Sequence, residues 1–362
     1  MAEARSFSRR QVLQLASLGG TLLASGALAG CRSGGDAGRL LSARGELPAA
    51  WLKALPPSWR SEQLETPEAL LEVLRQPQEQ PLLLSLGDGW AQQLPPARLQ
   101  PLEAPVLLQL LDPMAEAPSR LFAGPEAPAR AFPWAFGTWV ILLRNRPDLQ
   151  RRRAEGWDLL LDPSLRQRLV LPASPRLLID LAMRQLGLSS LEANAIEDPR
   201  LPVQLRRLHA QALSLDEPNG LNLLLAGEAD AAVVPSQRAV PLLQRDPRLM
   251  AVLPASGSPL WWQLLVRIAP DQAAQPMAPL PLEWLRDGLS LPLLDRLLAA
   301  GWVPPLPRKQ LQPALASWPE RLRPLLLPPA AVLARCSSLP SLAAPQRQQW
   351  QLLWDQAMEA RS

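Results

Sequence analysis

The side chains that commonly perform nucleophilic, acid–base or metal chemistry are scarce in this chain. Its 362 residues include one histidine (His209), two cysteines (Cys31 and Cys336) and no tyrosine. A structural zinc site needs about four cysteine or histidine ligands. A serine or cysteine nucleophile would need the single histidine as its base. We therefore expect no metal site, no cofactor and no enzymatic activity, and the composition favours binding over catalysis.

The composition is that of a soluble globular protein. Lys and Arg number 37 against 33 Asp and Glu, and the net charge of +4 is spread along the chain, which argues against a nucleic-acid partner. Apolar residues make up 48% and charged residues 19%, so the chain is neither a disordered polyelectrolyte nor a multi-span membrane protein. The length predicts about two domains, and we expect a monomer.

The first 31 residues have the layout of an export signal. Arg9 and Arg10 precede an uncharged stretch, Val12 to Gly30, that is rich in glycine, alanine and serine. Adjacent arginines before a weakly apolar stretch resemble a twin-arginine signal peptide. The alternative is a transmembrane anchor, because a stretch of about 19 residues could span a bilayer, although its glycines and serines make a poor span.

Cys31 closes this segment in the sequence Leu28-Ala29-Gly30-Cys31. This sequence resembles the lipobox of bacterial lipoproteins, in which the cysteine takes a diacylglycerol and becomes the new N-terminus. We expect the mature protein to be periplasmic and held at the membrane by this lipid, with residues 32–44 as a flexible tether. Cys336 then has no partner, so no internal disulfide is expected.

Helix and strand signals alternate through the remaining chain. Helices are predicted at 66–74, from Trp90, at 174–187 and at 201–215, and short strands at 82–86, 106–111, 139–143, 169–171, 231–234 and 260–268. His209 lies beside Arg206 and Arg207 and is expected on a helix surface. The alternation predicts the α/β class.

Five blocks of residues carry a family resemblance. They are Pro133–Thr138, Trp157–Pro163 with the strand after it, Ser174–Leu188, Gly227–Val234 and Trp261–Gln263. In this order they resemble the periplasmic spermidine/putrescine-binding proteins of ABC transporters, within the extracellular solute-binding superfamily. The resemblance covers about half of the chain. It implies two α/β lobes joined by crossover strands, a type II-like periplasmic-binding-protein fold, with a ligand cleft that closes by hinge motion.

The resemblance also implies a site for a solute of polyamine type. Such a solute needs carboxylates for its ammonium groups and aromatic faces along its methylene groups. Leu177 and Gln263 stand where the family carries acids, so Asp88 is the best remaining acid. The expected ligand-binding residues are Ser85, Asp88, Trp90, Thr138, Trp139, Ser174, Arg176, Ser236, Trp261 and Gln263.

Several of these residues also have a purely structural interpretation. Asp88 stands between glycines, where aspartate often serves a turn. Arg176 could pair with Asp180 one helical turn later. The strand period places the rings of Trp261 and Trp262 on opposite faces, so that one lies in the core.

The function implied by the resemblance is that of a lipid-anchored substrate-binding component of an ABC importer. Its partners would be permease and ATPase subunits and a small solute, a polyamine or a related molecule. Two alternatives remain: an envelope scaffold that keeps the fold without capturing a solute, and a binder of a carboxylated solute. Lobe 1 is expected to comprise residues 45–140 and 256–362, and lobe 2 residues 141–255.

Overall fold

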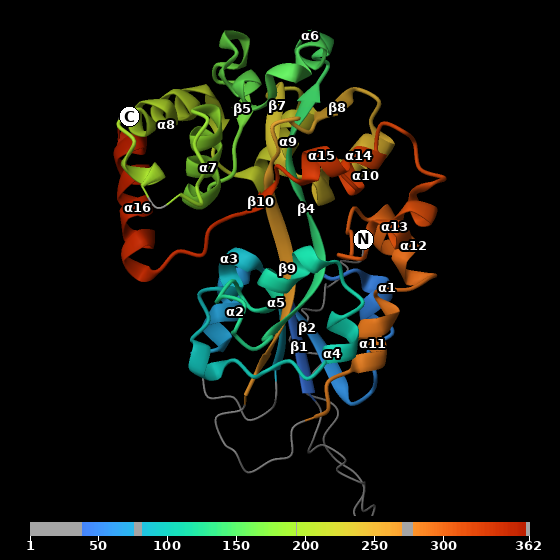
Figure 1. Cartoon of the computed structure of the whole chain (residues 1–362). Helices are drawn as coiled ribbons and strands as arrows, with labels where there is room; N and C mark the ends of the chain where they lie inside the picture. The colour runs from blue at the N-terminus through green and yellow to red at the C-terminus, as the bar shows by residue number, and fades with distance from the viewer. Residues whose placement is uncertain (1–37, 76–81, 193, 270–277, 360–362) are drawn as a thin grey trace, which may run out of the picture. The chain divides into compact units, whose positions relative to one another are not determined.

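Strand β4 (Ala131–Arg144) passes through both halves of the fold. Its first part, Ala131–Thr138, pairs antiparallel with β9 (Pro259–Ile268), and its second part, Trp139–Leu143, pairs antiparallel with β7 (Ala231–Pro235). Nearly every residue of β4 is buried, as expected for a strand covered on both faces. β4 therefore joins the sheet of lobe 1 to the sheet of lobe 2 (Figure 1).

The computed structural model describes residues 38–75, 82–192, 194–269 and 278–359, all within the compact unit Asp36–Ser362. Arg9, Arg10 and Cys31 lie outside the described residues. The predicted tether is wrong in its second part, because residues 38–43 form a buried strand.

Lobe 1 is built on three parallel strands. The last of them in the chain pairs antiparallel with β9. They are β1 (Gly38–Ala43), β2 (Trp59–Leu64) and β3 (Leu82–Gly87), in the order β2-β1-β3-β9. Its helical segments are α1 (Ala49–Leu52), α2 (Pro67–Val73), α3 (Asp88–Ala91), α4 (Pro105–Leu108), α5 (Glu116–Ser119), α11 (Leu282–Asp287) and the 3₁₀ turns Pro96–Arg98 and Pro113–Ala115. Trp51 and Trp284 stack at 4.3 Å in its core, and each indole N–H donates to the other residue's carbonyl.

Lobe 2 contains shorter strands around the second part of β4. They are β7, β5 (Leu169–Val170), β6 (Ala212–Ser214) and β8 (Leu249–Val252). Its helical segments are α6 (Pro147–Arg151), α7 (Pro175–Gln185), α8 (Leu201–Gln211), α9 (Glu217–Ala226), α10 (Ser236–Arg245) and the 3₁₀ segments Arg153–Leu161, Pro163–Leu165 and Ala195–Glu197. Together the two lobes form the expected α/β architecture.

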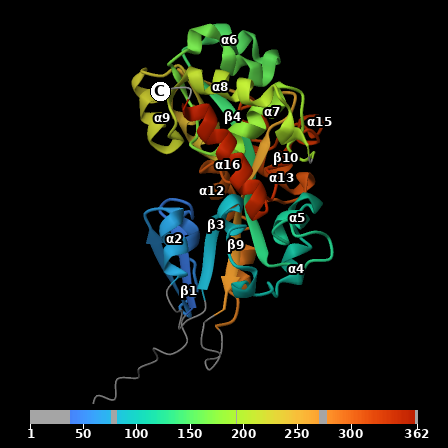
Figure 2. The same ribbon diagram turned by 90° about the vertical axis from the view of Figure 1, so that its left-hand side faces the viewer.

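The C-terminal part of the chain does not stay in lobe 1, which corrects the predicted boundary. Its remaining elements are α12 (Leu293–Ala299), α13 (Arg308–Leu315), α14 (Arg323–Leu326), α15 (Ala330–Leu333), β10 (Ser337–Ser338) and α16 (Ala344–Glu359). Helix α14 packs on α10, and α16 packs on α7 and α8 (Figure 2). Trp350, Leu353, Trp354 and Ala357 of α16 recur at helical spacing and are buried in the apolar cluster of lobe 2.

Helix α7 follows its sequence signals closely. The Ser174 Oγ accepts a hydrogen bond from the Leu177 N–H at 3.3 Å, Pro175 occupies the first helical position, and Gly187 follows the helix with φ +72°. The Gly187 conformation is the left-handed one that ends helices. The predicted helix at 174–187 is confirmed.

Three local predictions are wrong. Residues 106–111 do not form a strand, since Pro105 begins the short helix α4. The helix predicted to Leu215 ends at Gln211, because residues 212–214 form β6 beside β5. His209 is fully buried instead of exposed, since α16 covers α8 and Trp354 contacts its ring edge-on at 4.6 Å.

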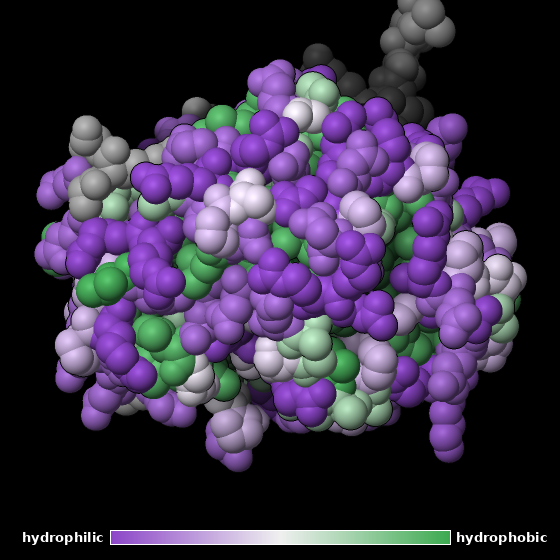
Figure 3. All heavy atoms as spheres, turned by 90° about the horizontal axis from the view of Figure 1, so that it is seen from above, coloured by the Kyte–Doolittle hydropathy of each residue, from purple (hydrophilic) through white to green (hydrophobic). Residues whose placement is uncertain are grey.

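The face of lobe 2 seen from above is mostly hydrophilic, with hydrophobic side chains in small separate groups (Figure 3). Scattered apolar side chains are normal on protein surfaces. Among the residues that the structure describes, no helix has the length and apolar character needed to cross a bilayer.

Candidate functional site

A cavity of about 1060 Å³ lies between the lobes, where several strands end. Lobe 1 contributes Arg44–Glu46 after β1, Gly87–Trp90 after β3, and Trp261–Gln263 of β9. Lobe 2 contributes Pro172–Arg176 before and at the start of α7. It also contributes Pro235 at the end of β7, with Gln237 and Arg238 after it. The carboxyl ends of neighbouring parallel strands meet at one edge of a sheet, where α/β proteins bind ligands.

The cavity walls are rich in tryptophan. The indoles that line the cavity belong to Trp90, Trp139, Trp261, Trp262, Trp302 and Trp350. Trp262 is 1% exposed and donates to the Ser338 Oγ, whereas Trp261 is partly exposed, as the strand period predicts. Flat apolar walls of this kind suit an organic solute with an apolar or aromatic body and also favour a cation over a ring face.

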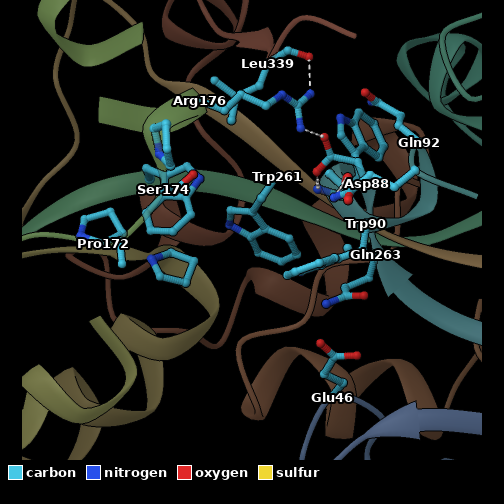
Figure 4. Close-up of a pocket in the computed structure, with 18 of the residues that line it drawn as sticks. Glu46, Asp88, Trp90, Gln92, Pro172, Ser174, Arg176, Trp261, Gln263 and Leu339 are labelled. Atoms are coloured by element: carbon cyan, nitrogen blue, oxygen red, sulfur yellow. Dashed lines mark hydrogen bonds and ion pairs between the residues drawn. The ribbon is translucent and has the colours of Figure 1, made fainter. Parts of the chain in front are cut away.

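Asp88 and Arg176 form an ion pair between the lobes. The Arg176 Nη1 lies 3.0 Å from the Asp88 Oδ2, and both side chains are largely buried. The second Asp88 oxygen accepts a hydrogen bond from the backbone N–H of Trp262 at 3.3 Å. The expected acid therefore lines the cavity with its charge already balanced by an arginine of the opposite lobe (Figure 4).

The alternative partner for Arg176 was Asp180, and this pairing is wrong. Asp180 is buried and pairs with Arg184, whose Nε lies 2.6 Å from its Oδ2. Arg176 turns toward the chain segment before α16, where it donates to the carbonyls of Leu339 and Pro340.

Glu46 is a cavity residue that the sequence analysis missed. Its side chain faces Gln263 in the lobe 1 part of the cavity (Figure 4), and its Oε2 is shielded from solvent with no hydrogen-bond partner among the described residues. Burial raises the pKa of Glu46 to about 7, although hydrogen bonds from the Ala43 backbone and Gln263 and the positive charge of Arg238 act in the opposite direction. A cationic partner would stabilise the ionised form of such a buried carboxyl group more than it would an exposed one.

Three other lining side chains carry a buried polar atom without a hydrogen-bond partner in the described part of the chain. They are the Nε2 of Gln92, the Nε1 of Trp139 and the Oε1 of Gln263. Buried polar atoms in folded proteins are nearly always paired with protein, water or ligand. With Glu46, they give the cavity both donors and acceptors for a bound molecule.

The structure places seven of the ten expected site residues at the cavity. They are Asp88, Trp90, Trp139, Ser174, Arg176, Trp261 and Gln263. Ser85, Thr138 and Ser236 are at most 1% exposed and do not line the cavity, which corrects their expected place. The Ser85 Oγ accepts from the Trp134 indole, and the Ser236 Oγ accepts from the Thr138 N–H, so strand packing accounts for both.

The missed lining residues come from two parts of the chain. Glu46 follows β1, which reads in the sequence as the end of the tether, although Leu40-Leu41 before Gly45 is a short apolar run that a buried strand could explain. Trp302 and Trp350 come from the C-terminal region, where proline interrupts the pattern of apolar residues and hides how the helices pack.

Metal ligands do not gather at this site. Within residues 38–359, outside the three internal gaps in the description, no group of three or more His, Cys, Asp or Glu side chains could hold an ion.

Comparison with solved structures identifies the fold. No protein-family profile and no curated sequence matches the chain. The spermidine/putrescine ABC transporter substrate-binding protein PotD of Streptococcus pneumoniae superposes with a TM-score of 0.70 at 15% identity, covering 90% of this chain and 100% of that one. The Tp0655 (TpPotD) lipoprotein of Treponema pallidum gives 0.60 at 11% identity over 89% and 99%. The ferric binding protein of Campylobacter jejuni gives 0.55 at 11% identity over 88% and 98%.

These neighbours differ in what their names say they bind, and all share less than 25% of their sequence with this chain. The likeness therefore concerns the arrangement of the chain, and it covers nearly the whole of each neighbour. The expected two-lobed architecture is confirmed: the chain has the fold of the periplasmic solute-binding proteins of ABC importers.

Proposed function

We propose that this protein is the substrate-binding component of an ABC importer and captures a small organic solute between its lobes. One observation carries the proposal: a cavity of about 1060 Å³ lined from both lobes contains a buried carboxyl group, Glu46, whose Oε2 has no hydrogen-bond partner among the described residues. Binding of a cationic group there would pair this charge. The tryptophan walls would cover the body of the solute.

The strands that cross between the lobes support a closing motion. Trp139 and Thr138 stand where β4 changes its partner from β9 to β7. Small dihedral changes at such a point rotate one lobe against the other, as in hinge closure around a ligand. A solute that contacts Glu46 in lobe 1 and the start of α7 in lobe 2 would stabilise the closed arrangement.

The proposed location is the periplasmic face of a membrane. Arg9 and Arg10 would direct export as part of a signal peptide, and a lipid on Cys31 would attach the protein to the membrane. The proposed partners are a permease and an ATPase subunit. The names of the structural neighbours, which include a lipoprotein and ABC transporter components, support this proposal. An inspection of the neighbouring genes for a permease and an ATPase tests the partners directly.

A thermal-shift screen of the purified protein against polyamines, amino acids and small anions tests solute capture. A solute at about 100 times its Kd adds ~2.7 kcal/mol to the free energy of unfolding, which is a readily measured rise in Tm. Small-angle scattering with the best solute should show a smaller radius of gyration. If no solute in the screen shifts the Tm, the importer role fails and the envelope scaffold takes its place.

Glu46→Gln is the matched variant for this screen. It keeps the size and polarity of the side chain and removes the charge. We expect its affinity for a cationic solute to fall by ~1.5–3 kcal/mol, the contribution of a hydrogen bond to a charged group, while its circular dichroism spectrum stays that of the parent. An unchanged affinity would show that Glu46 does not bind the cationic group of the solute.

A further inference from the structure

We propose that Arg176 is a resident cation of the cavity, and that the solute therefore carries one cationic group and one hydrogen-bond acceptor instead of the several ammonium groups of a linear polyamine. This inference rests on the proposed function, because it names the class of solute.

Arg176 is held as a part of the cavity wall. Its Nη1 donates to Asp88 at 3.0 Å, its Nη2 to the Leu339 carbonyl at 2.5 Å and its Nε to the Pro340 carbonyl at 2.9 Å. The two carbonyl contacts hold the guanidinium independently of Asp88. Figure 4 shows the contacts of Arg176 with Leu339 and Asp88. A second ammonium group would have to displace an arginine with three anchoring hydrogen bonds, so the Asp88 carboxylate is already taken.

The remaining lining acids leave one carboxylate for the solute. Asp216 caps α9, where its oxygens accept from the Asn219 N–H at 3.2 Å and the Asn219 Nδ2 at 2.6 Å. Glu46 alone keeps an oxygen without a hydrogen-bond partner among the described residues. Arg238 exerts a positive charge on the Glu46 site, which further disfavours a solute with two cationic groups.

The cavity also carries donors that a polyamine cannot satisfy. The indole N–H of Trp139 is buried without a hydrogen-bond partner in the described residues, and an indole nitrogen can only donate. The Nε2 of Gln92 is in the same state. A fully protonated polyamine has donors and no acceptors, so it would leave both groups unpaired. A carboxylate, carbonyl or hydroxyl on the solute supplies the kind of acceptor that these two donors lack.

Four probes with one benzene ring distinguish these requirements by isothermal titration calorimetry on the purified full chain. They are 4-(aminomethyl)benzoate (a zwitterion), benzylamine (a single cation), 1,4-bis(aminomethyl)benzene (a dication) and terephthalate (a dianion). We expect the zwitterion to bind at least about tenfold more tightly than the dication, with benzylamine between them and terephthalate weakest. Equal or tighter binding of the dication by the unaltered protein would overturn the inference.

Arg176→Gln adds a gain-of-binding test. The variant releases the Asp88 carboxylate into the cavity, so its affinity for the dication should rise by about tenfold or more relative to the parent. Arg176→Lys is the matched control, since it keeps a cation beside Asp88 and should gain little. A dication affinity that is the same in the parent and in a folded Arg176→Gln protein would contradict the role of Arg176.

Different results would contradict the proposed function and the solute class. The proposed function fails if no solute of any class stabilises the protein in the thermal-shift screen. The inference alone fails if spermidine or putrescine binds the unaltered protein as tightly as the best zwitterion, because the protein would then capture a solute and Arg176 would not exclude a second ammonium group. The affinities of the unaltered protein for the four probes test the inferred solute class even if an Arg176 variant does not fold.

Discussion

The carboxylate of Glu46 lies opposite the amide of Gln263, and burial at this place raises the pKa of Glu46 to about 7 (Figure 4). The two residues come from different parts of the chain, one from the turn after β1 and the other from β9. This relationship places a titratable group inside the cavity with a pKa close to neutral pH. Stability should therefore depend on pH through Glu46.

The first prediction concerns the pH dependence of unfolding. Unfolded Glu46 loses its proton near pH 4.5, whereas folded Glu46 keeps its proton up to about pH 7. The folded state thus binds more protons between these pH values, so the free energy of unfolding falls as the pH rises from about 4.5 to about 7. The shift corresponds to a loss of up to about 3 kcal/mol.

Urea unfolding at pH 5, 6, 7 and 8 tests this prediction in the parent and in Glu46→Gln. The variant cannot ionise at this position, so the decline attributable to Glu46 should vanish and the variant should gain stability relative to the parent as the pH rises. The difference between the two curves isolates Glu46 from every other titrating group. Parallel curves across this pH range would show that Glu46 titrates normally.

The second prediction concerns the Trp139 indole. Trp139→Phe removes a buried donor that has no partner among the described residues, so the free energy of unfolding should change little. The affinity for the best solute of the screen should fall by ~0.5–1.5 kcal/mol, the net value of one hydrogen bond. Calorimetry measures both, with Trp318→Phe as the control because Trp318 does not line the cavity. An equal loss in both variants would count against a specific contact.

Local signals in the sequence were sufficient for the elements that frame the cavity. Ser174-Pro175 fixes the start of α7, and the continuous apolar run of β4 indicates a strand buried on both faces. The Trp261 side chain is partly exposed and the Trp262 side chain is buried, because a strand alternates its side chains. Each of these results depends on neighbours in sequence, so spacing alone carries the information.

Contacts distant in the sequence decided the parts that could not be predicted. Asp88 and Arg176 are 88 residues apart, and nothing in either local sequence pairs them. Arg176 also binds carbonyls more than 160 residues further along the chain. His209 is buried where α16 returns to lobe 2 and places Trp354 on its ring. Such contacts depend on the path of the C-terminal region. Its many prolines interrupt the apolar pattern from which the helices could be predicted.

The third prediction concerns a buried ion pair in α7. Asp180 is 1% exposed, and its oxygens accept from the Arg184 Nε and the Ser190 Oγ. Arg184 also donates to the Ser337 Oγ of β10. Asp180→Ala leaves the Arg184 charge largely buried without its partner, so the free energy of unfolding should fall by ~3–5 kcal/mol.

Chemical denaturation measures this loss, and Glu72→Ala is the matched control. Glu72 of α2 pairs with Arg75 in the turn after the helix, and both side chains are exposed, so this ion pair contributes less than about 1 kcal/mol. If both variants lose similar stability, burial does not set the value of the Asp180 pair.

The fourth prediction concerns the attachment of the protein to the membrane. Each methylene of an acyl chain contributes ~0.8 kcal/mol when buried in lipid, so the chains expected on Cys31 would hold the protein firmly. Cys31→Ser removes the acceptor thiol. The protein should then move from the membrane pellet to the soluble fraction of fractionated cells, and its mass should lack the lipid.

Cys336→Ser is the matched control for this experiment, because the Cys336 thiol is partly buried and donates to the Val332 carbonyl at 3.4 Å. Burial raises the pKa of this thiol, which keeps it protonated and poorly reactive. Cys336→Ser should therefore stay in the membrane pellet with an unchanged lipid mass. If Cys31→Ser also stays in the pellet, the uncharged stretch from Val12 to Gly30 holds the protein as a transmembrane anchor, because only an uncleaved hydrophobic segment would survive loss of the thiol.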